Sequence, residues 1–366
     1  MVLEIKNIYY IILFFLIIGS VFDITNSKIK KQVFLFNFIV IFLFATLRYG
    51  VGSDYFQYEA LYQEALPLTK LKLKELLSNT HNLELGYLIL QSLIKEFTIS
   101  YRIFLIIYNL ILFYFLYKGI IYNKNRNIQL LIFYSLFYLF YITSTYRQGM
   151  AIVILYYNLQ NLELNNKKKF ILYVIFAGMF HRISFIYLLF YPILKKKIKK
   201  RVYLFLFIIC FILGYIDFLE KVLNILNLRL NTFSFFRRVY YYYTVKNNGK
   251  IGVSLLGYLQ KIILIFFMSF NLNRNKIIYN NLFFYYIISF ILFSNVGVLA
   301  GRISAVFAIV QVYYFSNSIY YLKKWEKVIL IFVLIVFCCM YFIKELYTIN
   351  PIRNEYNYLP YKILIF

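Results

Sequence analysis

Apolar runs long enough to cross a lipid bilayer recur along almost the whole of this 366-residue chain. A membrane-spanning helix needs a run of about 17–25 mainly apolar residues. The composition agrees, because 63% of the residues are hydrophobic and the mean hydropathy is +0.70, whereas soluble domains carry roughly 45–50% apolar residues. We therefore expect a single transmembrane domain over residues 1–366, an all-α, polytopic integral membrane helical bundle with roughly ten to twelve passes.

Lysine clusters predict how these passes are oriented. The clusters lie in short segments between apolar runs, and the positive-inside rule places such segments in the cytoplasm. This topology puts both termini outside, and it accounts for the formal net charge of +26 without nucleic acid as a partner. The clusters lie near residues 28–31, 118–124, 167–169, 195–201, 274–276 and 323–327. The expected passes cover residues 7–23, 32–47, 100–121, 128–144, 149–165, 202–219, 251–270, 281–297, 303–322 and 327–343.

Three segments do not fit a simple crossing. Lysine clusters flank both ends of residues 170–194, so we expect two short helices there that turn near His181 and Arg182. The other two are outer segments at about 48–99 and 220–250. The first of them is expected to hold a stretch that lies on the membrane surface, at residues 66–77, and an interfacial or re-entrant helix at residues 83–97.

The arginines are distributed differently from the lysines. The predicted topology leaves only Arg126, Arg201 and Arg274 inside and places the other arginines at or near the outer side. A guanidinium group binds phosphate bidentately and stays charged when partly dehydrated. Ionisable groups at the ends of apolar runs are usually functional, although long side chains also snorkel to lipid headgroups. The arginines at outer ends of apolar runs, which predict an anion-binding pocket there, are Arg48, Arg102, Arg147, Arg182 and Arg302.

Carboxylates are scarce, and this bears on the kind of substrate. The only aspartates are Asp23, Asp54 and Asp217, and no two are near enough in sequence to hold the metal–diphosphate complex that nucleotide-sugar enzymes commonly use. No glycine-rich phosphate loop and no zinc motif is present, and the three cysteines lack metal-binding spacing. We therefore expect no metal, no cofactor and a phosphate ligand carried by a membrane lipid.

The polar outer stretches supply candidates for proton transfer. His81 lies in a polar segment and is expected to be solvated, whereas His181 ends an apolar run, where an imidazole acts as a base or hydrogen-bond donor or simply packs. Gly50 and Gly52 permit a tight turn whose amides can face an anion. Asp54, directly after this turn, is placed to accept a proton or to hold an arginine.

Four of these segments together resemble the motifs of a known family. Residues 48–58 (RYGVGSDYFQY) are similar to the arginine-glycine-aspartate-tyrosine segment of the EpsG/Wzy-like polysaccharide polymerase family. Residues 146–151 (YRQGMA) resemble its Arg-Gln motif, and residues 177–184 (AGMFHRIS) its alanine-to-histidine-serine motif. Residues 301–304 (GRIS), followed by Tyr-Tyr-Phe at 313–315, resemble its late arginine segment. The order and spacing of the four cover most of the chain.

The resemblance implies a membrane glycosyltransferase. Members of that family join oligosaccharide repeat units carried on undecaprenyl diphosphate into O-antigen, capsule or exopolysaccharide, at the outer face of the bacterial cytoplasmic membrane. The implied partners are this lipid-linked oligosaccharide, membrane lipids, a flippase and a chain-length regulator. In this reading, Arg48, Arg147 and Arg302 hold the diphosphate, His181 or Asp54 orients the acceptor hydroxyl, and Arg182, Gln148 and Tyr58 support either ligand.

Three other functions remain open. A flippase or transporter of lipid-linked oligosaccharide is expected to carry charge near the bilayer midplane and to have paired halves, and this sequence shows neither. An O-antigen ligase-like glycan transferase would use nearly the same chemistry. A structural subunit would use its arginines only to contact headgroups.

Overall fold

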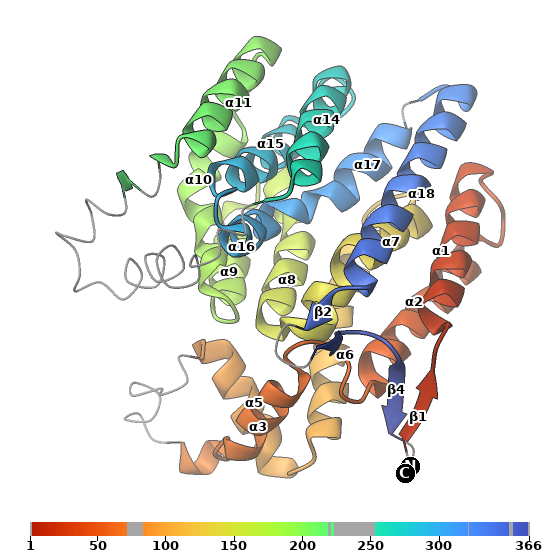
Figure 1. Cartoon of the computed structure of the whole chain (residues 1–366), viewed down its shortest axis with the longest axis vertical. Coiled ribbons are helices and arrows are strands. Elements are labelled where there is room, and N and C mark those ends of the chain that lie inside the picture. The colour runs from red at the N-terminus through yellow and green to blue at the C-terminus, as the bar shows by residue number, and fades with distance from the viewer. Residues whose placement is uncertain are drawn as a thin grey trace. The chain divides into compact units, whose positions relative to one another are not determined.

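The structure is a computed structural model that describes residues 2–71, 83–218, 221–222, 253–320, 322–350 and 354–364. Within these ranges the regular secondary structure consists of helices and two small two-stranded sheets. The chain divides into two compact units: unit 1 is Met1–Leu188 with Phe315–Phe366, and unit 2 is Leu189–Tyr314. The elements of both can be found in Figure 1 by label and by residue number along its colour bar. The all-α fold is confirmed, and the single transmembrane domain stays a prediction.

Most of the helices belong to unit 1. They are α1 (Ile8–Ile24), α2 (Lys30–Leu47), α3 (Tyr55–Glu64), η1 (Leu68–Lys70), α5 (Leu85–Phe97), α6 (Tyr101–Ile121), α7 (Arg126–Phe133), the π-helical η2 (Tyr134–Ser144), α8 (Tyr146–Glu163), α9 (Lys167–Gly178), η3 (Arg182–Phe185) and α18 (Lys324–Leu346). Its strands are β1 (Val2–Ile5), β2 (Ile349–Asn350), β3 (Glu355–Tyr356) and β4 (Tyr361–Leu364).

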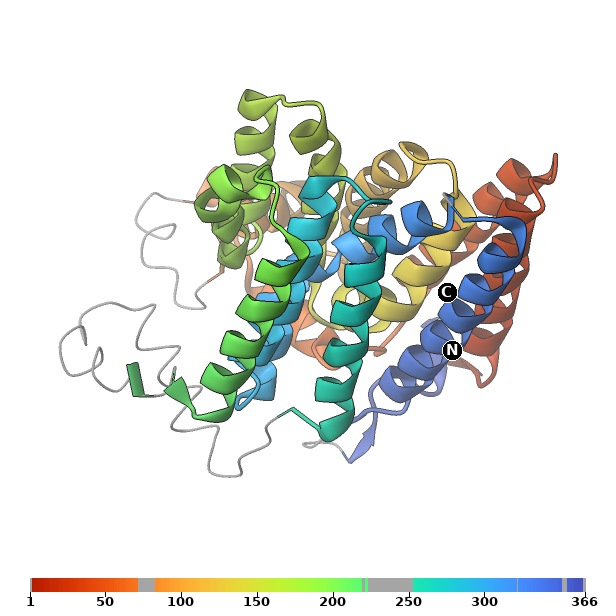
Figure 2. The same cartoon turned by 90° about the horizontal axis from the view of Figure 1, so that it is seen from above.

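Unit 2 holds a second group of helices. They are α11 (Lys200–Tyr215), α14 (Leu255–Asn271), α15 (Ile277–Leu292) and α16 (Gly297–Ala308), while α10 (Ile186–Leu194) and α17 (Val310–Tyr320) run from one unit into the other. Both α11 and α14 pack against α15, and Figure 2 shows them on either side of it. Apart from residues 221–222, the predicted outer segment at 220–250 lies outside the described residues, as does the second half of 66–77, residues 72–77.

A helix lies at every predicted pass. Considered alone, four helical segments are long and apolar enough to cross a membrane, and α16 with α17 makes a fifth if this bent pair is one span. Further apolar helices, among them α1, α14 and α15, are shorter. The predicted ten to twelve passes therefore depend on these shorter helices too. Residues 170–194 form α9, η3 and α10, which confirms the predicted pair of short helices with a turn at His181.

Asp23 has a structural role that its position in an apolar run does not reveal. Its buried carboxylate, on α1, accepts hydrogen bonds from the backbone N–H groups of Asn127 at 2.7 Å and Ile128 at 3.1 Å. These groups lie in the first turn of α7, where backbone N–H groups have no partner within the helix. A carboxylate at a helix N-terminus supplies that partner and complements the helix dipole. Asp23 thus fastens α1 to the start of α7.

The two chain ends form one sheet. Strand β1 pairs antiparallel with β4, in a register that joins Leu3 to Ile363, and Lys362 Nζ lies 3.1 Å from Glu4 Oε1. Figure 1 shows the N and C marks at the same end of unit 1. The two termini therefore lie on the same side of the bundle, as the predicted topology requires. That this side faces the outside of the cell stays a prediction.

The turn after α2 is held between two distant parts of unit 1. Tyr49 N–H donates to Lys362 O and Gly52 N–H donates to Asn357 O, both at 2.8 Å. Gly50 and Gly52 have φ values of +64° and +105°, a region that residues with a side chain rarely adopt. A Cβ atom on Gly52 would lie 2.2 Å from Thr143 O. Glycine is therefore required where the turn meets the end of η2.

We expect Gly52→Ala to destabilise the protein by roughly 1–3 kcal/mol or more, because it adds both a strained φ and a clash with a backbone oxygen. The measurement is the melting temperature of the purified protein in detergent. Gly301→Ala is the matched control, since a Cβ there meets nothing within 4 Å. Equal melting temperatures for the two variants would contradict the packing of this turn.

We expect cysteines introduced by Glu4→Cys and Lys362→Cys to react with a membrane-impermeant maleimide in intact cells, because both termini are predicted outside. The background replaces Cys210, Cys338 and Cys339, which are free thiols in this structure. Lys168→Cys, in a cluster predicted inside, serves as the control and should react only after permeabilisation. Labelling of the terminal cysteines only after permeabilisation would reverse the predicted orientation.

Candidate functional site

Arg147 lies in the first turn of α8 and forms an ion pair with Glu84, the residue directly before α5. Its Nη1 contacts Glu84 Oε2, and the side chains of Arg147 and Glu84 are 26% and 10% exposed. Because the pair is largely shielded from water, loss of one partner would leave the other charge poorly compensated. The pair therefore fastens the start of α5 to the start of α8.

Two stacked tyrosines join Arg147 to a second arginine. Arg147 Nε donates a long hydrogen bond to Tyr58 Oη at 3.5 Å. The Tyr58 ring stacks on the Tyr146 ring, with centroids 4.4 Å apart and planes at 9°. The Arg48 guanidinium carbon lies 4.8 Å from the centroid of the Tyr146 ring, within the range of a cation–π contact. The 48–58 and 146–151 segments are thus brought into direct contact.

The Tyr58 phenol is protonated in this setting. Burial raises its pKa, and the nearby Arg147 guanidinium opposes that shift only in part. A neutral phenol oxygen accepts a hydrogen bond from a guanidinium without forming a second ion pair. Tyr58 consequently orients the Arg147 guanidinium without neutralising its positive charge.

Arg48 is turned toward the protein interior. It is 3% exposed, its Nη1 donates to Ala45 O, and its Nη2 donates to Ile142 O at 3.3 Å. These contacts tie the end of α2 to η2. A substrate phosphate would have to replace these hydrogen bonds to reach the Arg48 guanidinium. In this conformation Arg48 therefore packs on Tyr146 and helps to hold the stacked Tyr146 and Tyr58 rings in place.

The start of α5 also contacts the turn that carries His181. Gly86 N–H donates to Met179 O at 2.8 Å, and a Cβ on Gly86 would lie 2.8 Å from Met179 Cβ. His181 follows in an extended conformation, and its N–H donates to Ala177 O at 3.0 Å. The first turn of α5 therefore links the 177–184 segment to the Arg147–Glu84 pair.

Asp54 is part of the turn after α2. Its Oδ1 accepts a hydrogen bond from the Ser53 hydroxyl at 2.7 Å, and Ser53 N–H donates to Ser144 Oγ at 3.1 Å. Asp54 is half-buried directly before α3, the helix that carries Tyr58. The turn and α3 thus set the position of Asp54 on the same side of unit 1 as the stacked tyrosines.

The remaining predicted residues are distributed over both units. Gln148 is buried next to Arg147 in α8, and Arg182 begins η3. Arg102 is half-buried in the first turn of α6. Arg302 is half-buried on α16 and belongs to unit 2, which is described by itself. Some residues predicted on the outer side of the membrane are not among the residues that the structure describes: His81, Arg229, Arg237, Arg238 and Arg353.

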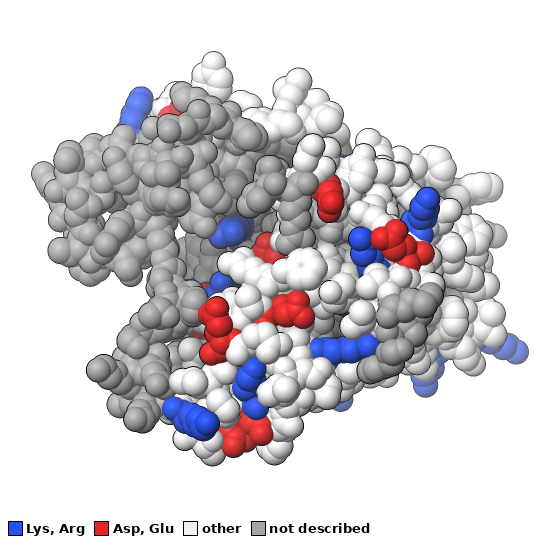
Figure 3. Space-filling view, turned by 60° about the horizontal axis from the view of Figure 1, so that its bottom comes forward, with Lys and Arg blue, Asp and Glu red and all other residues white. Residues whose placement is uncertain are grey.

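The surface around the site carries both signs of charge. Figure 3 turns the end of unit 1 with α3 and α5 toward the viewer, and Lys and Arg side chains lie among Asp and Glu side chains there. A mixed surface gives only a weak long-range attraction for an anion. Binding of a phosphate here would therefore depend on the shielded guanidinium of Arg147.

Glu84 and Tyr146 are the two contact residues that sequence reasoning missed as site residues. The sequence offers only general signals for them: Glu84 is one of few carboxylates and lies two residues before Gly86, and Tyr146 directly precedes Arg147 in a recognised motif. Their roles depend on partners 63 and 98 residues away, Arg147 for Glu84 and Arg48 for Tyr146.

Comparison with known proteins identifies the family of the chain. No curated protein and no solved structure matches the chain. A protein-family profile described as the EpsG family matches residues 31–363, a range that includes all four motif segments and both residues of the Arg147–Glu84 pair. The chain therefore belongs to the EpsG family, as its motifs predict, and is a multi-pass membrane protein of the polysaccharide polymerase type.

Proposed function

We propose that this protein joins undecaprenyl-diphosphate-linked oligosaccharide repeat units into a surface polysaccharide at the outer face of the bacterial cytoplasmic membrane. The observation that carries the proposal is the shielded Arg147, which Glu84 and Tyr58 orient within a segment that the family profile covers. A guanidinium held in this way suits a diphosphate, because it offers paired donors and remains charged when water is excluded.

The reaction is a glycosyl transfer between two lipid-linked sugars. The acceptor hydroxyl oxygen attacks the anomeric carbon of the growing chain, and the bond between that carbon and the diphosphate oxygen breaks. The electron pair leaves with the lipid diphosphate, and the hydroxyl proton passes to a base. We assign the developing negative charge to Arg147, because fixed positive charge aimed at a leaving group is commonly the largest catalytic contribution. His181 or Asp54 accepts the proton.

Glu84 keeps Arg147 in place while the site is empty. A diphosphate carries more negative charge than one carboxylate, so on arrival it competes for the same guanidinium. Arg147 then exchanges one anionic partner for another instead of being ordered from a mobile state, which lowers the entropic cost of binding. Arg48 acts as a positioning residue through Tyr146 and Tyr58. Gln148, Arg182 and Arg302 are proposed to contact the substrate as well.

A transporter is the weaker alternative. Carriers place their ligand groups near the bilayer midplane, commonly at interrupted helices. Here the ionic group lies in the first turn of α8, next to the first turn of α5. A ligase-like transferase would use the same groups, and only the product separates it from a polymerase.

We expect Arg147→Ala to lower polymer synthesis about 10²- to 10³-fold, the usual loss when one preorganised charge contact is removed. His181→Ala should also abolish long-chain polymer if His181 is the base. The assay is gel analysis of surface polysaccharide in a deletion strain that carries each variant, with the membrane level of the protein measured by immunoblot. Arg126→Ala is the matched control, since Arg126 begins α7 and is predicted inside.

The products decide between the candidate functions. Single repeat units attached to the lipid core indicate polymerase loss, whereas complete absence of transferred glycan indicates a ligase or a flippase. Normal polymer from Arg147→Ala, at a normal membrane level, would remove Arg147 from the site.

We expect the charge-reversed double variant Arg147→Glu with Glu84→Arg to regain the melting temperature that Glu84→Ala loses, yet to make no long polymer. The ion pair is restored in this variant, but a carboxylate occupies the place of the phosphate-binding group. Melting temperature and polysaccharide gels are measured in parallel. Recovery of both would show that the pair serves only folding.

A further inference from the structure

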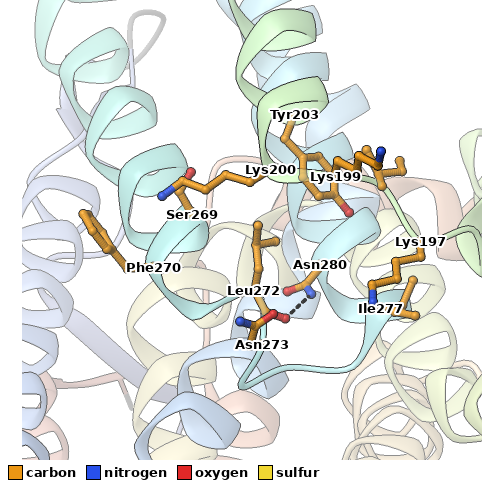
Figure 4. A pocket seen from close by; sticks show the side chains of 11 residues that line it. Lys197, Lys199, Lys200, Tyr203, Ser269, Phe270, Leu272, Asn273, Ile277 and Asn280 are labelled. Carbon is orange, nitrogen blue, oxygen red and sulfur yellow. Dashed lines mark hydrogen bonds between the residues drawn. The ribbon is translucent and has the colours of Figure 1, made fainter.

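Unit 2 contains a cavity at the turn between α10 and α11. It has a volume of about 220 Å³ and lies between this turn, the end of α14 and the start of α15. Lys197, Lys199 and Lys200 line it, together with Ser269 and Asn280, and all five are labelled in Figure 4. None of the described residues that line it is acidic. Its chemistry therefore favours an anion.

Two helices begin at this cavity. Helix α11 starts at Lys200 and α15 at Ile277, and both residues line the cavity. Within the described residues, neither start has a side-chain cap. The first N–H groups of a helix, which have no acceptor within the helix, and the positive end of its dipole favour a negatively charged group. The lysines add full positive charge to these partial charges.

Asn280 adds a hydrogen-bond acceptor. It is 4% exposed, and its Nδ2 donates to Leu272 O at 2.9 Å and to Asn275 O at 3.4 Å, which fixes the orientation of its amide. Its Oδ1 accepts no hydrogen bond from any described residue. A buried carbonyl oxygen of this kind is costly unless a donor reaches it. A hydroxyl next to the bound phosphate would satisfy it.

The surroundings suit a lipid better than a soluble phosphate. Phe270 also lines the cavity and is 74% exposed, and the Lys200 Nζ lies 4.9 Å from the centroid of its ring. An exposed aromatic ring beside a basic cavity is typical of a site at a membrane interface. The positive-inside rule predicts the cytoplasmic side for residues 195–201, where basic pockets bind anionic headgroups.

We propose that this cavity binds the phosphate of a hydroxyl-bearing headgroup, supplied by an anionic phospholipid of the inner leaflet. The phosphate lies against the three lysines and the two helix starts, and a headgroup hydroxyl donates to Asn280 Oδ1. The site is separate from the Arg147–Glu84 pair in sequence and does not depend on the polymerase proposal.

The test titrates the full-length protein, purified and delipidated in a non-ionic detergent, with four probes. The probes are dioctanoyl phosphatidylglycerol, dioctanoyl phosphatidylcholine, glycerol 3-phosphate and inorganic phosphate. Binding is read from the rise in melting temperature and from adducts in native mass spectrometry, since a ligand that binds only the folded state stabilises it. We expect saturable binding of phosphatidylglycerol and none of phosphatidylcholine.

The variants separate this site from general basic charge. The triple variant Lys197→Gln, Lys199→Gln and Lys200→Gln should bind phosphatidylglycerol roughly tenfold more weakly or worse, and the three Lys→Arg changes should retain binding. The control is the Lys→Gln triple at residues 167–169, at the start of α9, where the Asn166 side chain already caps the helix by accepting from Lys169 N–H. This control should bind as tightly as the unchanged protein.

Each outcome bears on the proposal. Saturable binding of glycerol 3-phosphate or inorganic phosphate that the Lys197, Lys199 and Lys200 changes abolish would support the phosphate site with a soluble source. Equal binding of phosphatidylcholine, unchanged binding in the 197/199/200 triple variant, or an equal loss in the 167–169 control would overturn it.

Discussion

The ion pair between Arg147 and Glu84 is the interaction on which the arrangement of the candidate site depends. It joins the first turn of α8 to the residue before α5, across 63 positions of sequence. Charges shielded from water are unfavourable unless they are paired and hydrogen-bonded, so the pair restricts where α5 can lie relative to α8. The helix start fixed in this way then contacts Met179, and so sets the turn that carries His181. One interaction therefore positions two of the recognised motifs.

The tyrosines explain how a second arginine contributes without contacting solvent. Arg48 is 3% exposed, its Nη1 and Nη2 donate to backbone carbonyls, and its guanidinium lies over the Tyr146 ring. Tyr146 in turn stacks on Tyr58, and Tyr58 orients Arg147. A guanidinium can make all of these contacts at once because it is planar and carries several donors, and a lysine cannot. This gives a physical reason for arginine rather than lysine at position 48.

The helices were predictable because the bilayer imposes their length. Apolar runs mark nearly every helix, and the lysine clusters on both sides of residues 170–194 led to the correct pair of short helices, α9 and α10. The contacts between helices were not predictable. The capping of α7 by Asp23 and the pairing of β1 with β4 join residues 104 and more positions apart. No local pattern specifies such partners, because neither periodicity nor motif spacing encodes which helix lies next to which.

The same limit applies to the site. Motifs identified Arg48, Asp54, Tyr58 and Arg147, and the structure connects them through direct contacts and one shared turn. Glu84 was missed because a single carboxylate before a helix has no distinguishing pattern until its partner is known. Arg302 lies in the other unit, so its role in the site rests on its motif alone.

The lysines around the cavity of unit 2 and the arginines of the candidate site in unit 1 differ in how far they are removed from water. This difference depends on the chemistry of the two side chains as well as on membrane topology. In unit 2, Lys197, Lys199 and Lys200 line an accessible cavity where a hydrated ammonium can remain partly in water. Lys261 shows what burial of an ammonium requires: it is 1% exposed, its Nζ lies 2.6 Å from Tyr286 Oη, and the centroid of the Phe290 ring is 4.0 Å away. A phenol oxygen and ring faces must replace the lost hydration there. Positive-inside topology alone demands only charge, so the choice of guanidinium beside the stacked tyrosines and ammonium around the open cavity follows from how much water each group must give up.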